Sequence, residues 1–226
     1  MKFLGSNISV GNRAIWAAVG VGGPSEISAS DDFNQADGVF NTTRWTDAYG
    51  INSVSILNNK LRTSSASGSV GVDNNATLPA DSWFASNELL TNDIAAPGSG
   101  NYQAALVLFF ASGRNVVCRF TNTQGIGERL DILDTVGGEL HTEAASLPFS
   151  GSQSMEVIQN GSNIDVKFYR DGSLKHTLSN INETPTKVRL NGNNAAGANT
   201  WIVDNDNFEL KNGTLASPGS SLTIPL

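Results

Sequence analysis

The chain has 226 residues, of which 23 are glycine and only 15% are charged, and this composition favours many tight turns over long helices. A net charge of −7 repels phosphate backbones, so nucleic-acid binding is not expected as the main activity. No apolar run approaches the roughly 18 residues of a membrane span, and the single cysteine, Cys118, excludes an internal disulfide.

Residues 1–30 are interpreted as an N-terminal arm. Apolar side chains recur along it, and each would gain roughly 1.5–3 kcal/mol on burial, so we expect the arm to rest on a surface. That surface is either its own sandwich or a partner subunit joined by strand addition. Polar residues interrupt the segment, so it lacks the apolar core of a signal peptide and predicts folding in a cytoplasm. The predicted partner contacts are Phe3, Leu4, Ile8, Val10, Ile15 and Trp16.

Residues 31–211 alternate short apolar runs with turn signals. SVSILNNKLRT (53–63) predicts two strands around Asn58-Asn59, and SWFASNELLT (82–91) predicts another. QAALVLFF (103–110) is continuously apolar, as in a central strand covered on both faces. In the next predicted strand Val116, Cys118 and Phe120 share one face, which indicates that the thiol is buried and unreactive.

MEVIQNGSNIDVKFYRDGSLKHTL (155–178) predicts a meander of three strands. Asn160-Gly161 and Asp171-Gly172 each separate alternating apolar runs, and both turn residues of such hairpins must accept positive φ. About a dozen short strands without an amphipathic helix indicate two packed antiparallel sheets. We therefore predict a sandwich domain over 31–211 and a short C-terminal tail over 212–226.

DDFNQADGVFNTTRW (31–45), WIVDNDNFEL (201–210) and the meander together resemble the concanavalin A-like lectin/glucanase jelly roll in its laminin-G-like form. The resemblance implies an all-β, two-sheet antiparallel jelly-roll sandwich, here with an extended N-terminal arm and a short C-terminal tail. It also implies that the Asp-Asp-Phe start and the Asp-Asn-Phe-type end pair as neighbouring strands. It implies little about function, because function depends on sites rather than folds.

Catalytic motifs are not supported. Glucanases of this family carry two carboxylates on one strand in a Glu-x-Asp-x-x-Glu type motif, but the spacing of Glu128 and Asp131 puts them on opposite faces. Glu139 and Glu143 are able to share a face, yet no aromatic platform follows them. No nucleophile elbow, zinc motif or phosphate loop is present, so we predict that the protein is not an enzyme. A glucanase-type hydrolase stays as a second alternative.

Candidate ligand residues fall in two sets. Pairing of the first and last strands would gather carboxylates suited to Ca²⁺, the one cofactor considered; Asx-type turns are the alternative interpretation. A bulge near 204–207 would be needed to place Trp201 and Phe208 on one face. Glycan stacking needs exposed aromatic rings, and we expect Trp45 and Trp201 to pack inside instead. The candidates are Asp31, Asp32, Asp204 and Asp206 for metal and Trp83 and Tyr102 for glycan.

An apolar arm, a tail and a lectin-like body without chemistry predict a structural protein of a phage virion. It would be a capsid decoration or cement protein or a tail-fibre-associated protein, located in the virion after folding in the host cytoplasm. Its predicted partner is the major capsid or tail protein, in a homo-oligomer or lattice, with binding of host-surface glycans as an accessory role. A free carbohydrate-binding module is the first alternative.

Overall fold

The computed structural model describes residues 26–49, 54–92, 101–123, 127–146, 148–195 and 200–226. Within these ranges the chain forms seventeen strands and no helix, and therefore no helix that is long and apolar enough to cross a membrane. The strands are β1 (Glu26–Ser28), β2 (Trp45–Asp47), β3 (Val54–Ile56), β4 (Leu61–Ser65), β5 (Gly68–Asn74), β6 (Trp83–Thr91), β7 (Asn101–Phe110), β8 (Asn115–Thr123), β9 (Gly127–Asp134), β10 (Gly138–Ala144), β11 (Ser150–Asn160), β12 (Asn163–Arg170), β13 (Ser173–Ile181), β14 (Pro185–Ala195), β15 (Trp201–Thr214), β16 (Ser217–Ser221) and β17 (Thr223–Pro225).

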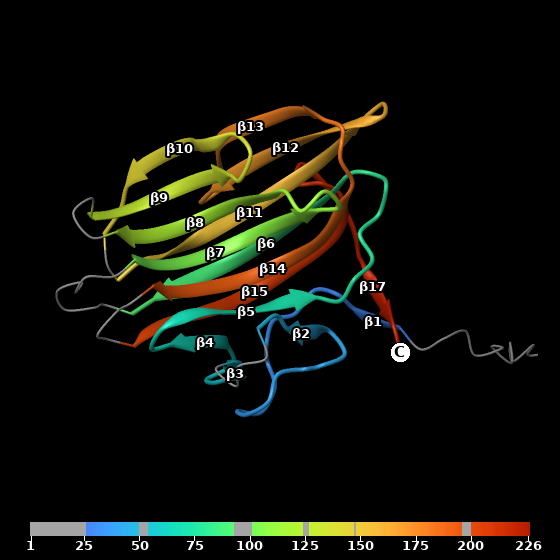
Figure 1. The fold of residues 1–226 in the computed structure, drawn as a ribbon. Coiled ribbons are helices and arrows are strands. Elements are labelled where there is room, and N and C mark those ends of the chain that lie inside the picture. Colours follow the sequence, from blue (N-terminus) through green and yellow to red (C-terminus); the bar gives the residue numbers. More distant parts are fainter. Residues whose placement is uncertain (1–25, 50–53, 93–100, 124–126, 147, 196–199) are drawn as a thin grey trace, which may run out of the picture.

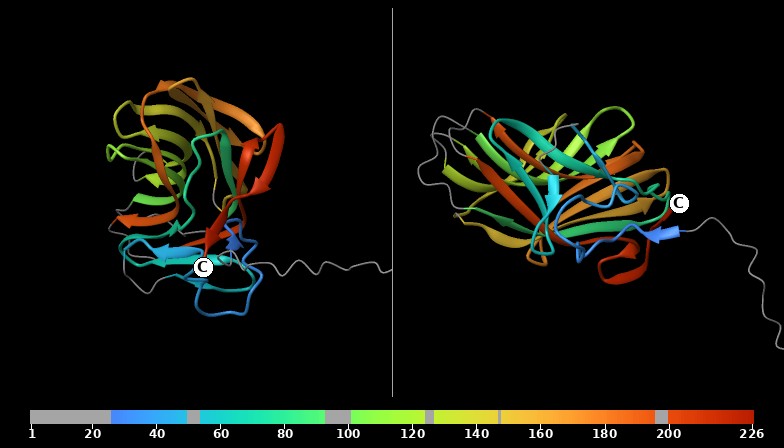
Figure 2. Two further views of the ribbon diagram at one scale, coloured as in Figure 1. Left: turned by 90° about the vertical axis from the view of Figure 1, so that its right-hand side faces the viewer. Right: turned by 90° about the horizontal axis from the view of Figure 1, so that it is seen from below.

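Two antiparallel sheets form the body. The seven-stranded sheet has the order β10-β9-β8-β7-β14-β5-β2, and the eight-stranded sheet has the order β13-β12-β11-β6-β15-β4-β3, with β16 beside β15. Strands β10 to β5 of the first sheet follow one another from top to bottom in Figure 1. The quarter-turned view in Figure 2 shows the two curved layers face to face. The predicted all-β, two-sheet antiparallel sandwich is confirmed.

The tight turns follow the sequence signals with one displacement. Asp171 and Gly172 have φ of +48° and +73°, as predicted, and Asn58 and Asn59, predicted to separate two strands, have φ of +53° and +58°. At the other hairpin Asn160 pairs with Asn163 as the last strand residue, so the turn residues are Gly161 and Ser162. Of these two turn residues only Gly161 has positive φ. Asn160 therefore belongs to the strand and not to the turn.

The central strand β7 is buried on both faces, as its apolar run predicted. Ala104 to Leu108 are all buried, and Cys118 on the neighbouring β8 is also buried, which raises the pKa of its thiol. On the outer face Val107 lies between Val117 and Arg189, and the Arg189 guanidinium lies 4.6 Å from the Phe109 ring centroid. Among the described residues, long side chains of neighbouring strands therefore cover this face.

The core has two apolar clusters. The larger contains Trp45, whose ring lies 4.8 Å from Phe208, and the smaller contains Tyr102, whose ring lies 5.6 Å from Trp201. A row of buried polar side chains crosses the inner face of the eight-stranded sheet between them, from Asn205 on β15 through Asn87 and Gln153 to Arg170 on β12. Hydrogen bonds along the row offset part of the desolvation of these groups.

The first and last parts of the sandwich meet as the resemblance implied. Asp31 and Phe208 form an antiparallel bridge. The β15–β6 register shifts between Asp206 and Glu209, and Asn207 has φ of +47°. This is the predicted bulge, and it allows Trp201, Val203, Phe208 and Leu210 all to be buried.

The structure places the domain limits differently from the predicted boundaries of 31 and 211. Strand β15 continues through residue 211 to Thr214, and the following residues form β16 and β17. Strand β1 pairs with β17, with Glu26 opposite Pro225. Leu222 and Ile224 belong to the larger core cluster, so the predicted tail completes the sandwich rather than leaving it.

Candidate functional site

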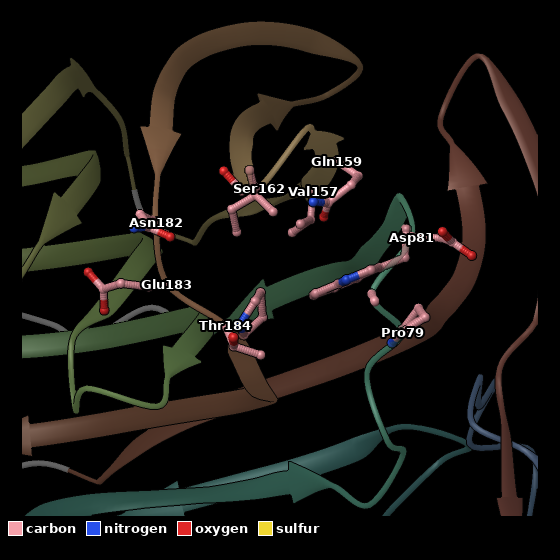
Figure 3. A pocket seen from close by; sticks show the side chains of 12 residues that line it. Pro79, Asp81, Val157, Gln159, Ser162, Asn182, Glu183 and Thr184 are labelled. Carbon is pink, nitrogen blue, oxygen red and sulfur yellow. The ribbon is translucent and has the colours of Figure 1, made fainter.

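A pocket opens at one end of the sandwich, where three connections meet (Figure 3). These are the β5–β6 connection, the β11–β12 turn and the β13–β14 connection. The cavity measures about 210 Å³. Its apolar lining consists of Pro79, Ala80, Trp83, Val157, Ile164 and Pro185, and its polar lining consists of Asp81, Gln159, Ser162, Asn182, Glu183 and Thr184.

Local sequence explains why these residues meet. Strand β6 begins at Trp83, which lies between Val157 of β11 and Asn212 of β15 in the eight-stranded sheet. The positive φ of Gly161 reverses the chain and leaves Ser162 at the turn. Pro185 starts β14, a position where the missing N–H of proline is tolerated. The pocket thus lies at one end of the two sheets, in the space that the three connections leave open.

Trp83 differs from the other buried tryptophans of the described chain. The indole Nε1 of Trp45 donates to Asp31 Oδ2 at 3.0 Å, and that of Trp201 donates to the Gln103 carbonyl oxygen at 2.8 Å. The Nε1–H of Trp83 is buried and has no hydrogen-bond partner among the described residues, and the whole residue is only 1% exposed. Leaving a buried donor unpaired costs about 1–3 kcal/mol, so a polar acceptor in this pocket would be stabilising.

Free polar groups also line this pocket. Asp81, Asn182 and Ser162 are exposed, and within the described chain their side chains form no hydrogen bond or ion pair. Glu183 is engaged: it accepts hydrogen bonds from the Ser112 hydroxyl and, at 3.0 Å, from Arg114 Nη1, and these bonds lower its pKa. Asp81 and Glu183 lie on opposite sides of the pocket in Figure 3.

A second concavity, of about 470 Å³, lies on the outer face of the eight-stranded sheet. Small side chains form its floor, since Ser86 of β6 lies opposite Ser154 of β11. Glu88 and Glu209 also line it, and Leu215 at the tip of the β15–β16 hairpin donates its backbone N–H to Glu156 at 2.9 Å. We call this concavity the outer groove.

Tyr169 closes one side of the outer groove and is tied to the same carboxylate. Its hydroxyl donates to Glu156 Oε2 at 2.8 Å. Burial, together with this hydrogen bond and the negative charge of Glu156, raises the pKa of Tyr169 to about 12. Tyr169 is therefore a neutral hydrogen-bonding group over the whole physiological pH range.

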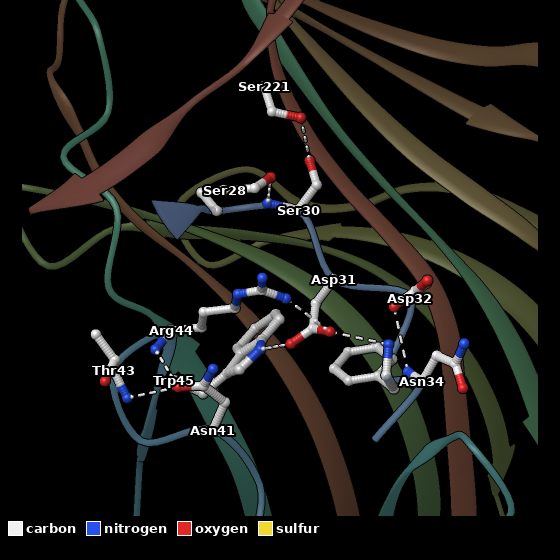
Figure 4. A network of polar contacts seen from close by, with 12 residues as sticks. Ser28, Ser30, Asp31, Asp32, Asn34, Asn41, Thr43, Arg44, Trp45 and Ser221 are labelled. Atoms are coloured by element: carbon white, nitrogen blue, oxygen red, sulfur yellow. Dashed lines mark hydrogen bonds and ion pairs between the residues drawn. The ribbon is translucent and has the colours of Figure 1, made fainter. Parts of the chain in front are cut away.

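The structure does not gather the four predicted metal ligands. Asp31 binds Arg44 at 3.0 Å and accepts hydrogen bonds from Trp45 and from the Phe33 backbone (Figure 4). Asp204 is held by two hydrogen bonds of 2.7 Å from Arg62, and Asp206 lies 3.0 Å from Lys60. Among the described residues Asp32 accepts a hydrogen bond only from the Asn34 N–H, at 3.2 Å. The predicted cluster is wrong, because basic side chains take the carboxylates, and the described residues contain no alternative group of metal-binding side chains.

The two aromatic residues predicted to be exposed are buried. Trp83 is 1% exposed at the pocket, and Tyr102 is 0% exposed in the smaller core cluster at the tyrosine–tryptophan contact with Trp201. Alternation along a strand does not reveal whether its odd- or its even-numbered residues face the core. The prediction that Trp83 and Tyr102 are exposed was therefore wrong. Trp45 and Trp201 are buried as predicted.

The remaining sequence candidates do not converge on one site. The arm contacts Phe3, Leu4, Ile8, Val10, Ile15 and Trp16 lie outside the described residues. A bulge between Glu139 and His141 separates Glu139, which contacts Arg129, from Glu143, which contacts Lys175 on the other sheet. The expectation that Glu139 and Glu143 share a face is therefore not met.

Several solved structures share this fold over most of the chain, whereas no protein-family model and no curated protein sequence matches it. The carbohydrate recognition domain of Emp47p aligns at 10% identity and TM-score 0.57 over 84% of this chain and 95% of that chain. The alginate lyase from Corynebacterium sp. aligns at 12% identity and TM-score 0.58, over 78% and 99% of the respective chains. LamAcat from Zobellia galactanivorans aligns at 12% identity and TM-score 0.55, over 80% and 95%. These similarities show the fold alone, a two-sheet antiparallel jelly-roll sandwich.

Proposed function

We propose that this protein is a non-enzymatic carbohydrate-binding module that holds one sugar ring in the end pocket beside Trp83. The buried, unpaired Nε1–H of Trp83 at the pocket carries the proposal: a small shift of the indole would let a sugar hydroxyl reach it and supply the acceptor that the described residues do not provide. The free side chains of Asp81, Asn182 and Ser162 offer both donors and acceptors for the remaining hydroxyls. The similarity in fold to a carbohydrate recognition domain supports the same ligand class.

Substitution of Trp83 by phenylalanine tests the proposal most directly. Trp83→Phe keeps an aromatic ring at the pocket but removes the N–H together with part of the indole, so affinity for the bound sugar should fall at least roughly five- to tenfold, the effect expected for one neutral hydrogen bond. The free energy of unfolding should fall by about 1–3 kcal/mol, because the smaller ring leaves a cavity in the larger core cluster, and removal of the unpaired donor offsets part of that cost.

A glycan array with the full chain, followed by titration calorimetry on the strongest ligand, provides the measurement. Trp201→Phe is not a suitable control, since it removes a satisfied bond in the core. Ser69→Ala, on β5 away from the pocket, is a suitable control and should leave affinity unchanged. Binding that is equally strong in Trp83→Phe and wild type would contradict the role of the indole.

A glucanase-type hydrolase is the second candidate, and the outer groove favours it. Glu88 and Glu209 line this groove on neighbouring strands, and glycosidases need two carboxylates that flank the scissile bond. We propose that the groove performs no hydrolysis. A reducing-sugar assay decides: activity in the wild type that is lost in Glu88→Gln and Glu209→Gln, but kept in Glu139→Gln, would establish the hydrolase instead.

A role in a phage virion remains a prediction from the apolar arm, and the described residues carry no support for it. Its test is deletion of residues 1–22 with assembly as the readout. A truncated protein that still joined the capsid or tail would contradict anchoring by the arm.

A further inference from the structure

We infer that the end pocket selects uncharged or amino-bearing sugars and excludes sugars that carry a carboxylate or sulfate group. The inference rests on the proposed function and narrows its ligand class. It follows from the charges around the pocket and from which of them are already paired.

The charged residues that line the pocket are both acidic. Asp81 and Glu183 belong to the lining, and none of the described lining residues is a lysine or an arginine. Asp81 is exposed and forms no ion pair with the described residues, so its charge is not compensated locally. An anionic ligand would therefore meet a like charge at the rim without a cation to receive it.

Arg114, which contacts the lining residue Glu183, does not supply a free cation for an anionic ligand. Arg114 donates from Nε and Nη2 to Asp134 at 2.9 and 2.7 Å, and from Nη1 to Glu183 at 3.0 Å. Its positive charge is thus already paired with two carboxylates, one of which, Glu183, lies between Arg114 and the rest of the pocket lining. The surroundings of the pocket hold more carboxylates than cations, in a chain whose net charge is −7.

The available polar groups suit hydroxyl and ammonium ligands. Trp83 offers a neutral donor that a hydroxyl oxygen can accept, and Asn182 offers both an acceptor and a donor. Asp81 accepts hydrogen bonds from a hydroxyl and would form a charge-assisted bond with an ammonium group, which is the stronger of the two. A carboxylate or sulfate at the same position would desolvate next to Asp81 without compensation.

Matched ligands test this selectivity in the full chain. Three forms of the sugar identified by the array are compared: the neutral sugar with its hydroxymethyl group, the uronic acid with a carboxylate at that position, and the aminomethyl form. Calorimetry at neutral pH and low salt measures the affinity of each. One uncompensated like charge near the rim should weaken the uronic acid about tenfold relative to the neutral sugar. The amino form should bind at least as tightly as the neutral one, and added salt should reduce both differences.

Asp81→Asn provides the matched variant, with Asp32→Asn, a carboxylate outside the pocket, as control. The ratio of the affinities for the neutral sugar and the uronic acid should fall at least about threefold in Asp81→Asn and stay unchanged in the control. A uronic acid that binds the wild type as tightly as the neutral sugar would overturn the inference and leave the proposed function standing. Absence of any saccharide binding would overturn both.

Discussion

At the scale of single residues, each deeply buried carboxylate of the described chain lies against basic side chains. Asp131 is fully buried on β9, where Arg119 and Arg129 contact it at 3.2 and 3.1 Å and Thr142 donates to it at 3.0 Å. Asp31 has the same kind of surroundings with Arg44, Trp45 and the Phe33 backbone. Breaking such a pair leaves an uncompensated charge or donor in the core, which is more costly than losing an exposed pair.

Asp31→Ala should therefore lower the free energy of unfolding by about 3–5 kcal/mol. The substitution leaves the Trp45 N–H, the Phe33 N–H and the Arg44 guanidinium without their acceptor. Asp32→Ala is the control, since Asp32 is exposed and accepts a single bond from Asn34, and it should cost less than about 1 kcal/mol. Urea denaturation of both variants measures the difference, and equal losses would contradict the structural role of Asp31.

Tyr169 should ionise about two pH units above an ordinary tyrosine, with a pKa of about 12 instead of 10.0. The folded state favours the neutral phenol, so this group stabilises the fold below pH 10 and loses that contribution as the pH rises through 12. Absorbance of the phenolate as a function of pH measures the step, with circular dichroism to check that the chain stays folded. Glu156→Gln should move the step to lower pH and Glu88→Gln should not; a step unmoved by Glu156→Gln would contradict the assigned cause.

At the scale of secondary structure elements, close backbone approaches set the spacing of strands. Gly71 of β5 lies opposite Asn191 of β14, and a Cβ atom at Gly71 would lie 2.5 Å from the Leu190 carbonyl oxygen. That oxygen is part of the backbone of a paired strand, so it cannot move without displacing the strand. Glycine is required here by the approach of β14, since its φ is not positive.

Gly71→Ala should consequently lower the free energy of unfolding by about 1–3 kcal/mol, as overpacking does in cores. Ser69→Ala, on the same strand and partly exposed, should change it by less than about 0.5 kcal/mol. Thermal and urea unfolding of the two variants supply the comparison. A stable Gly71→Ala variant would mean that β5 and β14 separate more easily than their contact distance implies.

The elements show which features the sequence could predict. Asp171-Gly172, Asn58-Asn59 and the bulge predicted near residues 204–207, found between Asp206 and Glu209, depend on neighbours along the chain, so local signals were sufficient. The end pocket depends on Asp81, Ser162 and Asn182 meeting from three separate connections, and no local signal specifies that meeting. The burial of Trp83 was missed for a related reason: Phe84 beside it is also buried, so the strand carries no alternation there.

At the scale of the whole molecule, the C-terminal residues close the fold. The N–H of Ala29 donates to the Leu222 carbonyl oxygen at 2.7 Å, and β17 then continues the pairing with β1. Ile224 is 6% exposed and lies in the larger core cluster with residues from both sheets. Contacts between the two ends of the described chain therefore contribute to the stability of the sandwich as a unit.

Ile224→Ala should lower the free energy of unfolding by about 2–5 kcal/mol, the range for removing a buried aliphatic side chain. Leu226→Ala is the matched control, because Leu226 is 63% exposed two residues away. A single cooperative transition at lower denaturant concentration is expected for Ile224→Ala. Separate unfolding of the C-terminal segment before the body, detected by hydrogen exchange, would contradict its integration.

The antiparallel pairing of β1 with β17 also determines how the fold would respond to a pulling force. Glu26 and Pro225 are partners, so a load applied through the two chain ends acts on the same end of the pair. The hydrogen bonds would then break one after another in an unzipping geometry, whereas in a shear geometry they would all bear the load together. Stretched in this way, the sandwich should yield at low force and begin with the release of its C-terminal strand.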